Sequence, residues 1–400
     1  MIDIQQATEL VLASARSFGT EKVPLQECLG RILAQDMAAD RDFPPFHRVT
    51  MDGIAILGEA YESGLRTFPL QGTQAAGAPQ LSLNDKAGAL EVMTGAMLPA
   101  GADTVIRYED VKIEHGQATI VEGAAVKTGQ NVHLQGTDRR QSDIIVKAGA
   151  PLSPAELGVA ATVGLSHLYV QRMPRAVIVS TGDELVPVSA APAPYQIRTS
   201  NAYTIQAALR QWGAAAELLH ISDELEATRA ELKRCLQAYD FILLSGGVSK
   251  GKFDYVPAAL TDLGVKKHLH KVKQRPGKPF WFGELPGQCT VFALPGNPVS
   301  SFMCTQRYVG PWLRKCLGQP AFPGAFAMLD RDFHFRPDLT YFLQVRLYSD
   351  AESGRLMASP VEGKGSGDLA NLADADAFLE LPRGQDTFPK GGVYPVYRYR

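Results

Sequence analysis

Two short loops carry residue types that suit the binding of a phosphate-bearing ligand. One follows the apolar run 241–244, and the other follows the run 290–294. Their candidate ligand contacts are Ser245, Gly246, Gly247 and Ser249 in the first loop and Pro295, Gly296, Asn297 and Pro298 in the second. Glycines let the backbone approach a ligand closely, and the free N–H groups at a helix N-terminus favour an anion. Neither loop matches GxGxxG or GxxxxGK(S/T), so the sequence predicts a nucleotide-like pocket of another kind.

Acidic residues follow the same set of predicted strands. The segment Thr181, Gly182, Asp183 and Glu184 comes directly after the apolar run 176–180, while Asp223 follows the next strand and Asp254 ends the glycine loop. Carboxylates beside bound phosphates suggest Mg²⁺, which prefers oxygen ligands. The alternative is that Asp183, Asp223 and Asp254 only cap the helices that follow them. The residues alone leave both interpretations open.

Basic residues are concentrated between the two loops, over 266–278. We predict that Lys267, Lys271, Lys273 and Arg275 share one face of an extended segment. This segment is either an edge strand protected by lysines or a holder of an oxyanion or phosphate. Arg275 and Lys278 flank a Pro-Gly turn that can aim both side chains at one point, so these two are the favoured anion ligands. His268 and His270 also share a face, but with no third ligand at metal spacing we favour a structural role.

Composition limits the classes of function. The chain has 400 residues, which predicts about two to four domains, and its formal net charge of -2 gives no global attraction for nucleic acid. Five cysteines without a CxxC pair fit a reducing compartment. The first residues have no signal-peptide pattern, and no apolar run reaches the roughly 18 residues of a membrane span. We therefore expect a cytoplasmic protein that binds neither nucleic acid nor membrane.

The elements that must position these groups fall into four predicted domains. Alternating strands and helices over 172–316 predict an α/β domain whose parallel sheet is covered on both faces. A β-rich texture over 41–139 predicts an inserted domain, and the flanking segments 1–40 and 140–171 would together form a discontinuous N-terminal domain. The last segment, 317–400, predicts a C-terminal β domain. Its glycine-rich stretch 363–367 is interpreted as a flexible loop, with Ser366 as a candidate ligand contact.

Three places show helix-start patterns. Ser153 has Glu156 three residues later, the spacing of a capping box. Asp223 and Glu226 have the same spacing. Ser200 or Asn201 is predicted to cap the helix that follows them.

Six motifs, in order along nearly the whole chain, resemble the molybdopterin molybdenumtransferases, which insert molybdate into adenylylated molybdopterin. The motifs are 43–46 with Met51-Asp52-Gly53, 94–103, 180–185, 245–249, 276–279 and 295–298. Departures from the usual family pattern occur at His47, Val49, Ile54, Ser142, Thr199 and Arg275. Because the α/β loops keep the pattern better than the β-domain loop, binding at the adenylate end of the substrate is the firmer expectation.

The resemblance implies an elongated homodimer in which the α/β domain of one subunit faces the β domain of the other. It implies Mg²⁺-assisted cleavage of molybdopterin-adenylate, release of AMP, and transient contact with a molybdopterin adenylyltransferase and molybdoenzyme acceptors. The implied catalytic residues are Asp52, Thr94, Asp183, Glu184, Asp254 and Lys278. The implied metal ligands are Asp183, Glu184, Asp223 and Asp254. The remaining binding residues are those of the loops above, with Thr181, Gly182, Arg275 and Ser366.

Two other functions are weighed against this one. A related enzyme that adenylylates molybdopterin, or cleaves another pyrophosphate, shares the Ser-Gly-Gly-Val loop but typically lacks the inserted and C-terminal β domains. A non-enzymatic scaffold would not require the intact acids Asp183, Glu184 and Asp254. Molybdate-dependent release of AMP distinguishes all three.

Overall fold

The computed structural model describes residues 1–222, 224–247, 256–322, 324–363 and 365–400. Three residues of the predicted site, Asp223, Ser249 and Asp254, therefore lie outside the described residues. The chain divides into two compact units, each described below by itself. Unit 1 comprises Met1–Lys22, Gly30–Ile32 and Tyr169–Arg400, and unit 2 comprises Val23–Leu29 and Leu33–Leu168.

Unit 1 is built on a six-stranded sheet. Its strand order is β16 (Ala216–Ile221), β13 (Ala176–Thr181), β17 (Phe241–Ser245), β21 (Cys289–Leu294), β20 (Trp281–Leu285) and β18 (Lys266–His270). The first four strands are parallel, as predicted. The last two run antiparallel to their neighbours, because β20 returns directly into β21 as a hairpin, which needs no crossover helix.

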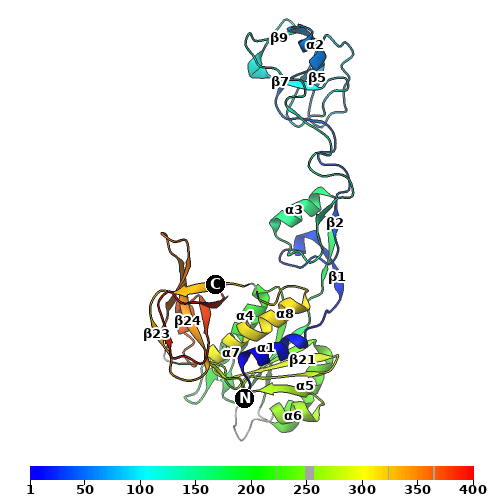
Figure 1. Cartoon of the computed structure of the whole chain (residues 1–400). Coiled ribbons are helices and arrows are strands. Elements are labelled where there is room, and N and C mark those ends of the chain that lie inside the picture. Colours follow the sequence, from blue (N-terminus) through cyan, green and yellow to red (C-terminus); the bar gives the residue numbers. More distant parts are fainter. Residues whose placement is uncertain (223, 248–255, 323, 364) are drawn as a thin grey trace. The chain divides into compact units, whose positions relative to one another are not determined.

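The alternation of apolar residues along the central strands gives this sheet two separate cores. On β13, Ile178 faces one core and Val179 faces the other, as side chains on a strand must. The first face packs against helices α1, α4, α7 and α8, and the second packs against α5 and α6 (Figure 1). The bounds are α1 Ile4–Ala13, α4 Asn201–Gln211, α5 Leu225–Ala238, α6 Val256–Asp262, α7 Pro298–Cys304 and α8 Gly310–Cys316. The predicted covering of both faces is confirmed.

Helix α1 belongs to the first of these cores through Ile4, Ala7 and Val11. Its N-terminus is closed by a capping box between Asp3 and Gln6. Residues 1–22 thus pack with the α/β sheet. The division of the chain into four domains with the boundaries given above stays a prediction.

The C-terminal part of unit 1 is a closed β-barrel. Its strands pair in the order β24 (Thr340–Ser349), β25 (Leu356–Pro360), β22 (Phe326–Leu329), β28 (Val393–Arg398) and β26 (Ala377–Leu381), and β26 pairs again with β24. Closure leaves no free edge among these five strands. A short strand from the α/β part, β19 (Gln274–Arg275), pairs in parallel with the start of β24.

Unit 2 contains a second six-stranded sheet, in agreement with the β-rich segment predicted from the sequence. The order is β7 (Thr104–Arg107), β4 (Gly53–Ile56), β6 (Ala89–Val92), β5 (Thr67–Gln74), β9 (Gln117–Ile120) and β8 (Val111–Glu114), with α2 (Gly58–Glu62) after β4. Gly53 sits where a Cβ atom would lie 1.9 Å from the carbonyl oxygen of Ile106, so only glycine allows this pairing of β4 with β7. Outside this sheet, α3 (Pro154–Thr162) begins with the predicted capping box of Ser153 and Glu156.

Short two-stranded ribbons complete the architecture. They pair β1 (Thr20–Pro24) with β12 (His167–Gln171), β2 (Met37–Ala38) with β11 (Ile144–Val146), β3 (Arg48–Val49) with β10 (Val132–His133), β14 (Leu185–Val186) with β15 (Ile197–Arg198) and β23 (Phe333–His334) with β27 (Thr387–Phe388). The remaining short helical segments are η1 (Leu25–Glu27), η2 (Tyr108–Asp110), η3 (Thr305–Val309) and α9 (Asn371–Asp374).

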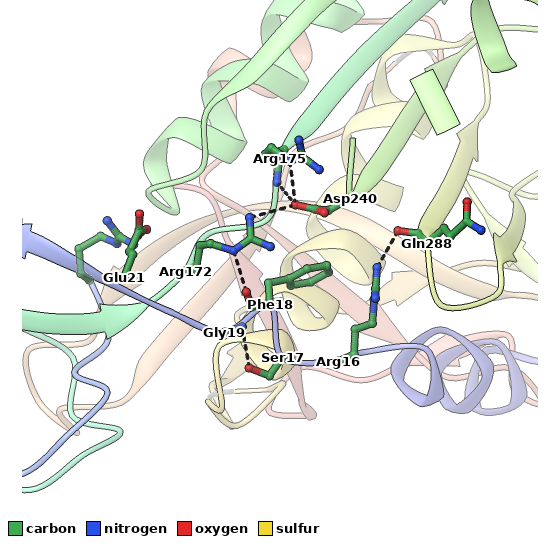
Figure 2. Close-up of polar contacts among 10 residues, drawn as sticks. Arg16, Ser17, Phe18, Gly19, Glu21, Arg172, Arg175, Asp240 and Gln288 are labelled. Atoms are coloured by element: carbon green, nitrogen blue, oxygen red, sulfur yellow. Dashed lines mark hydrogen bonds and ion pairs between the residues drawn. The ribbon is translucent and has the colours of Figure 1, made fainter. Parts of the chain in front are cut away.

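A polar cluster fixes the chain where β1 and β12 meet the α/β sheet (Figure 2). Asp240 is 7% exposed, and its carboxylate accepts a hydrogen bond of 2.8 Å from the backbone N–H of Arg175. The guanidinium of Arg172 approaches the same oxygen at 3.4 Å and donates through Nε to the carbonyl of Phe18 at 2.7 Å. Arg16 binds the carbonyls of Gly287 and Gln288. The segment before β1 is thereby tied to the turn between β20 and β21, and Arg172, directly after β12, is tied to Asp240 at the base of β17.

Candidate functional site

The carboxyl ends of three parallel strands meet in unit 1. Ser180 on β13 lies opposite Ser245 on β17, and Ser245 lies opposite Leu294 on β21. The glycine loop after Ser245 and the Pro-Gly-Asn-Pro loop after Leu294 therefore start side by side. This is the edge at which open α/β sheets bind their ligands.

Close backbone packing explains the glycines of the first loop. Gly246 and Gly247 have φ of 97° and 68°, a region that side chains rarely adopt. A Cβ atom at Gly247 would lie 2.9 Å from Oγ1 of Thr181, and one at Gly246 would lie 3.1 Å from the carbonyl oxygen of Thr181. A Cβ at Gly296 would lie 3.9 Å from the Cα of Gly246. The structure thus brings together four residues that the sequence analysis proposed as ligand contacts.

An asparagine that the sequence analysis considered only as a helix cap joins the two loops. The Nδ2 amide of Asn201 donates to Oγ of Ser245 at 2.9 Å and to the carbonyl oxygen of Gly296 at 2.7 Å. Ser200 is the N-cap residue of α4, and neither it nor Asn201 makes a side-chain capping bond in the described structure. A polar residue at a helix start is the only signal in the sequence, and capping explains that signal equally well.

The second loop is tied in turn to the barrel. Asn297 donates from Nδ2 to Oγ of Ser366 at 2.8 Å, and the backbone N–H of Val299 donates to the carbonyl of Ser366 at 3.1 Å. Asn297 is the N-cap residue of α7, yet its side chain makes no capping bond. Ser366, proposed from the sequence as a ligand contact, here holds the loop that follows β21.

A pocket of about 450 Å³ opens beside this loop. Its walls come from the Pro-Gly-Asn-Pro loop, the turn 275–278, strand β24 and the glycine-rich segment around Ser366. Among the described residues that line it, Arg275 and Lys278 carry the charge, and both are exposed. Two cations beside backbone and hydroxyl donors suit an oxyanion.

The basic run does not form one extended strand, so the prediction that four of its cations share a strand face is wrong. Strand β18 ends at His270, and Lys271 adopts φ of 73°, which turns the chain. The reason is the return of the chain through the turn into β20, closed by a bond from Lys271 N–H to the carbonyl of Phe280. His268 bonds Glu284 at 3.0 Å, which fits the structural role favoured for it.

The acidic part of the predicted site is described in part. Asp183 and Glu184 follow β13 and are exposed, while Asp223 and Asp254 lie outside the described residues. Glu184 folds back on the loop. Its Oε2 comes so near to Gly182 that a Cβ atom added there would lie only 2.4 Å away. No group of three metal-ligating side chains occurs within the described part of the chain. Glu226 lies in the first turn of α5, where Glu224 is the N-cap residue without a side-chain bond.

In unit 2 the structure brings together Asp52 and Thr94. The Oδ1 atom of Asp52 accepts hydrogen bonds from the backbone N–H of Thr94 at 2.6 Å and from its hydroxyl at 2.8 Å. These bonds, the backbone one first, lower the pKa of Asp52. Nearby, Tyr108 donates to Glu91 at 3.2 Å, and burial with the charge of Glu91 raises the pKa of Tyr108 to about 12. Asp52 and Thr94, both exposed, thus form a fixed pair of an ionised carboxylate and a hydroxyl.

Comparison with known proteins finds similarity to one family along the whole chain. Residues 2–164 match the MoeA N-terminal region (domain I and II), residues 177–315 match a probable molybdopterin binding domain, and residues 327–399 match the MoeA C-terminal region (domain IV). The chain is 39% identical to a molybdopterin molybdenumtransferase of Synechocystis, with 100% of both chains covered. It is 31% identical to the one of Bacillus subtilis, over 100% of this chain and 94% of that one.

A solved structure shows the same architecture. The crystal structure of a molybdopterin biosynthesis MoeA protein from Pyrococcus horikosii superposes with a TM-score of 0.85 at 29% identity, covering 100% of this chain and 99% of that one. The protein described here belongs to the molybdopterin molybdenumtransferase family. The resemblance and the fold class inferred from the sequence are both confirmed. Among the described residues no helix is long and apolar enough to cross a membrane.

Proposed function

We propose that this protein is a molybdopterin molybdenumtransferase, an enzyme that inserts molybdate into adenylylated molybdopterin, releases AMP and forms the molybdenum cofactor. One observation carries the proposal at the level of the site. The glycine loop and the Pro-Gly-Asn-Pro loop are joined by Asn201, and the second loop forms a wall of the pocket that contains Arg275 and Lys278. A phosphate-suited loop pair thus lies next to an oxyanion-suited pocket.

Each part has a separate task in this proposal. The loop glycines Gly246, Gly247 and Gly296 allow the adenylate phosphates to approach the backbone, as the ends of parallel strands do in other α/β proteins. Lys278 and Arg275 hold molybdate, whose double negative charge calls for cationic donors. The pocket then places the oxyanion close to the phosphates that must be cleaved.

We assign Mg²⁺ to the acids that follow the parallel strands. Asp183 and Glu184 supply carboxylate oxygens, the donors that this cation prefers, and Asp223 and Asp254 are proposed as the further ligands. Mg²⁺ usually combines one or two carboxylates with substrate phosphates. When bound, it would neutralise charge on the pyrophosphate linkage whose cleavage releases AMP. In unit 2, Asp52 and Thr94 are proposed to act on the same substrate from the partner subunit of a homodimer.

The setting of the enzyme follows from the same proposal. All five cysteines are buried as thiols rather than joined in disulfides, which supports a cytoplasmic location. The substrate is a small molecule. Transient contact with a molybdopterin adenylyltransferase and with acceptor molybdoenzymes would allow direct transfer of unstable pterins between the proteins. No nucleic-acid partner is proposed, since the net charge is -2.

The test is molybdate-dependent release of AMP. Purified protein is mixed with adenylylated molybdopterin and Mg²⁺, with and without molybdate, and AMP is measured by chromatography. We expect AMP release to require molybdate and to fall at least tenfold, roughly 1.4 kcal/mol or more, in Lys278→Ala. Equal release with and without molybdate would refute the transferase. Consumption of ATP and unmodified molybdopterin would indicate an adenylyltransferase instead.

A further inference from the structure

The turn that presents Arg275 and Lys278 rests on a buried pair of polar side chains. Gln274 is 0% exposed, and its Nε2 amide donates to the carbonyl oxygen of Gly277 at 2.9 Å. Its Oε1 accepts a hydrogen bond of 2.5 Å from the hydroxyl of Tyr308, which is 1% exposed. One side chain therefore links the turn to the helical layer beneath it.

The hydroxyl of Tyr308 is aimed by its own surroundings. Tyr308 lies in the π-helical segment η3 (Thr305–Val309), an arrangement that redirects side chains and often occurs at functional sites. Its ring stacks on Phe280 with centroids 4.5 Å apart and planes 14° apart, and the guanidinium of Arg307 lies 5.4 Å from the ring centroid. Burial raises the pKa of Tyr308 well above its usual range, so the hydroxyl stays a donor.

The backbone conformation of Gly277 and its close packing fix the position of the turn. Its φ is 88°, and a Cβ atom there would lie 2.6 Å from Sγ of Cys304 and 2.7 Å from Cε of Met303. The backbone of the turn is therefore seated directly on α7. The stem is closed by a bond from the N–H of Val272 to the carbonyl of Lys278 at 3.0 Å.

Peptide geometry carries this anchoring to the anion side. The C=O of Gly277 and the N–H of Lys278 belong to one planar peptide, in which the two groups point in opposite directions. Because the carbonyl points to the buried amide of Gln274, the N–H of Lys278 points away from it. The amide of Gln274 and the backbone N–H of Phe280, which donates to the same carbonyl at 3.2 Å, thus hold the orientation of the peptide from which the side chain of Lys278 departs.

We propose that Gln274 and Tyr308 are positioning residues of the oxyanion site, which fix the Gly277–Lys278 peptide from below and so aim Lys278 and Arg275 at molybdate. Gln274 borders the pocket, but it is 0% exposed and acts through the turn. The inference rests on the proposed function, because it takes the pocket as the molybdate site. A purely structural role would require only that these buried groups find partners, and the carbonyl of Gly277 satisfies an Nε2 N–H of Gln274 in either case. The two roles therefore differ in what replacement of Gln274 does to molybdate affinity.

The experiment combines molybdate titration by calorimetry with thermal unfolding of the full-length protein. We expect Gln274→Leu to weaken molybdate binding roughly three- to tenfold, the loss of one anchoring hydrogen bond. Tyr308→Phe keeps the bond from Gln274 to Gly277, so its affinity should fall about twofold or less. In Gln274→Leu the buried hydroxyl of Tyr308 loses its partner, and this lowers Tm. The double variant Gln274→Leu/Tyr308→Phe has no such hydroxyl, so its Tm should return toward that of the wild type while its affinity for molybdate stays low.

Gln306→Leu is the matched control. Gln306 is a buried glutamine of the same π-helical segment, 7% exposed, and its Nε2 has no hydrogen-bond partner among the described residues. Its replacement should leave molybdate affinity unchanged. In AMP-release kinetics, Gln274→Leu should raise the KM for molybdate and leave kcat at saturating molybdate within about twofold, the pattern of lost uniform binding. Should Gln274→Leu fail to fold, Gln274→Met, which keeps the length of the side chain, is expected to give the same KM change.

Four results would overturn the inference. Affinity that recovers together with Tm in the double variant would mean that the pair serves stability alone. Equal weakening by Gln306→Leu would indicate a general loosening of the core. If Lys278→Ala weakens molybdate binding and the Gln274 variants do not, the positioning role fails while the proposed site stands. If Lys278→Ala has no effect either, the turn does not hold the anion, and the site assignment fails as well.

Discussion

Asp52 and Thr94 are 42 residues apart in sequence, yet two hydrogen bonds to a single carboxylate oxygen hold them together. The first comes from the backbone N–H of Thr94 and the second from its hydroxyl. Both favour the ionised carboxylate. Asp52 is thus kept charged and fixed at the end of a short strand, although it is exposed to solvent.

The titration of Asp52 checks this relationship. Its pKa is lowered from the ordinary value of 3.8, so its contribution to stability is present above that pH and is lost as the pH falls through the lower folded pKa. Thr94→Ala removes the hydroxyl bond but keeps the larger backbone one. We expect the pKa of Asp52 to rise part of the way to 3.8, measured by carboxyl carbon NMR. Thr119→Ala, a threonine paired with Thr67, is the control. An unchanged pKa in Thr94→Ala would contradict the geometry.

A buried ion pair offers a second prediction, on stability. Arg307, with a side chain 6% exposed, donates to Glu380 at 2.9 Å, and Tyr397 donates to the same oxygen. Glu380→Ala leaves a buried cation without its partner and should lower the free energy of unfolding by about 3–5 kcal/mol in urea denaturation. The exposed pair Arg234–Glu231 is the control, and its loss should change stability far less, because solvent screens it. Similar effects of the two changes would show that the Arg307 pair is not desolvated.

Asn201 provides a third prediction, because its side chain bridges the ends of β17 and β21. Asn201→Ala should lower kcat/KM for adenylylated molybdopterin by about tenfold, the effect of two lost hydrogen bonds. Asn201→Asp, which keeps the shape but loses the amide donors, should be as poor. Asn297→Ala, which loses only the bond to Ser366, should be milder. Wild-type kinetics in Asn201→Asp would mean that the loops hold their positions without this amide.

A fourth prediction concerns the metal. Removing divalent cations with a chelator should abolish AMP release, and Mg²⁺ should restore it. Asp183→Asn should raise the Mg²⁺ concentration required for half-maximal rate several-fold, about 1 kcal/mol or more. Asp262→Asn, an acid at the end of α6, is the control for charge removal. Full activity in the presence of the chelator would exclude a role for Mg²⁺.

Subunit complementation tests the proposed homodimer. Asp52→Ala and Lys278→Ala should each be inactive, because each removes one side of a shared site. After subunit exchange, each mixed dimer would hold one intact site of two, so each mixed dimer should recover about half the activity of a wild-type dimer. Exchange is verified with differently tagged subunits. No recovery after verified exchange would mean that each chain completes its own site.

Regular repetition made the α/β fold predictable from the sequence. Ile178 and Val179 already show that neighbouring residues of β13 must face two apolar layers, and the capping box of Ser153 fixes the start of α3. The turn at Lys271 was missed, since a run of cations is compatible with an extended strand until the return into β20 is known. Local patterns cannot give such long-range pairing.

The site was predictable only where residue type and strand end coincide. Gly246 and Gly296 satisfy both conditions and lie next to each other. Asn201 and Gln274 do not, because an amide at a helix start or within a run of basic residues has many ordinary explanations. Their roles depend on partners 44 and 34 residues away, which the sequence does not reveal.

The pairing of β19 with β24 bears on how this protein can be divided. Gln274 and Arg275 belong by sequence to the α/β segment, yet their backbone pairs with Thr340 and Tyr341 of the barrel. The barrel therefore cannot be removed without altering the pocket, since it supplies both a wall of the pocket and the strand with which the start of the cationic turn pairs. If the pocket binds the anion as proposed, the smallest unit that can bind it is the α/β domain together with its barrel. An exchange of barrels between relatives would then replace part of the proposed anion site.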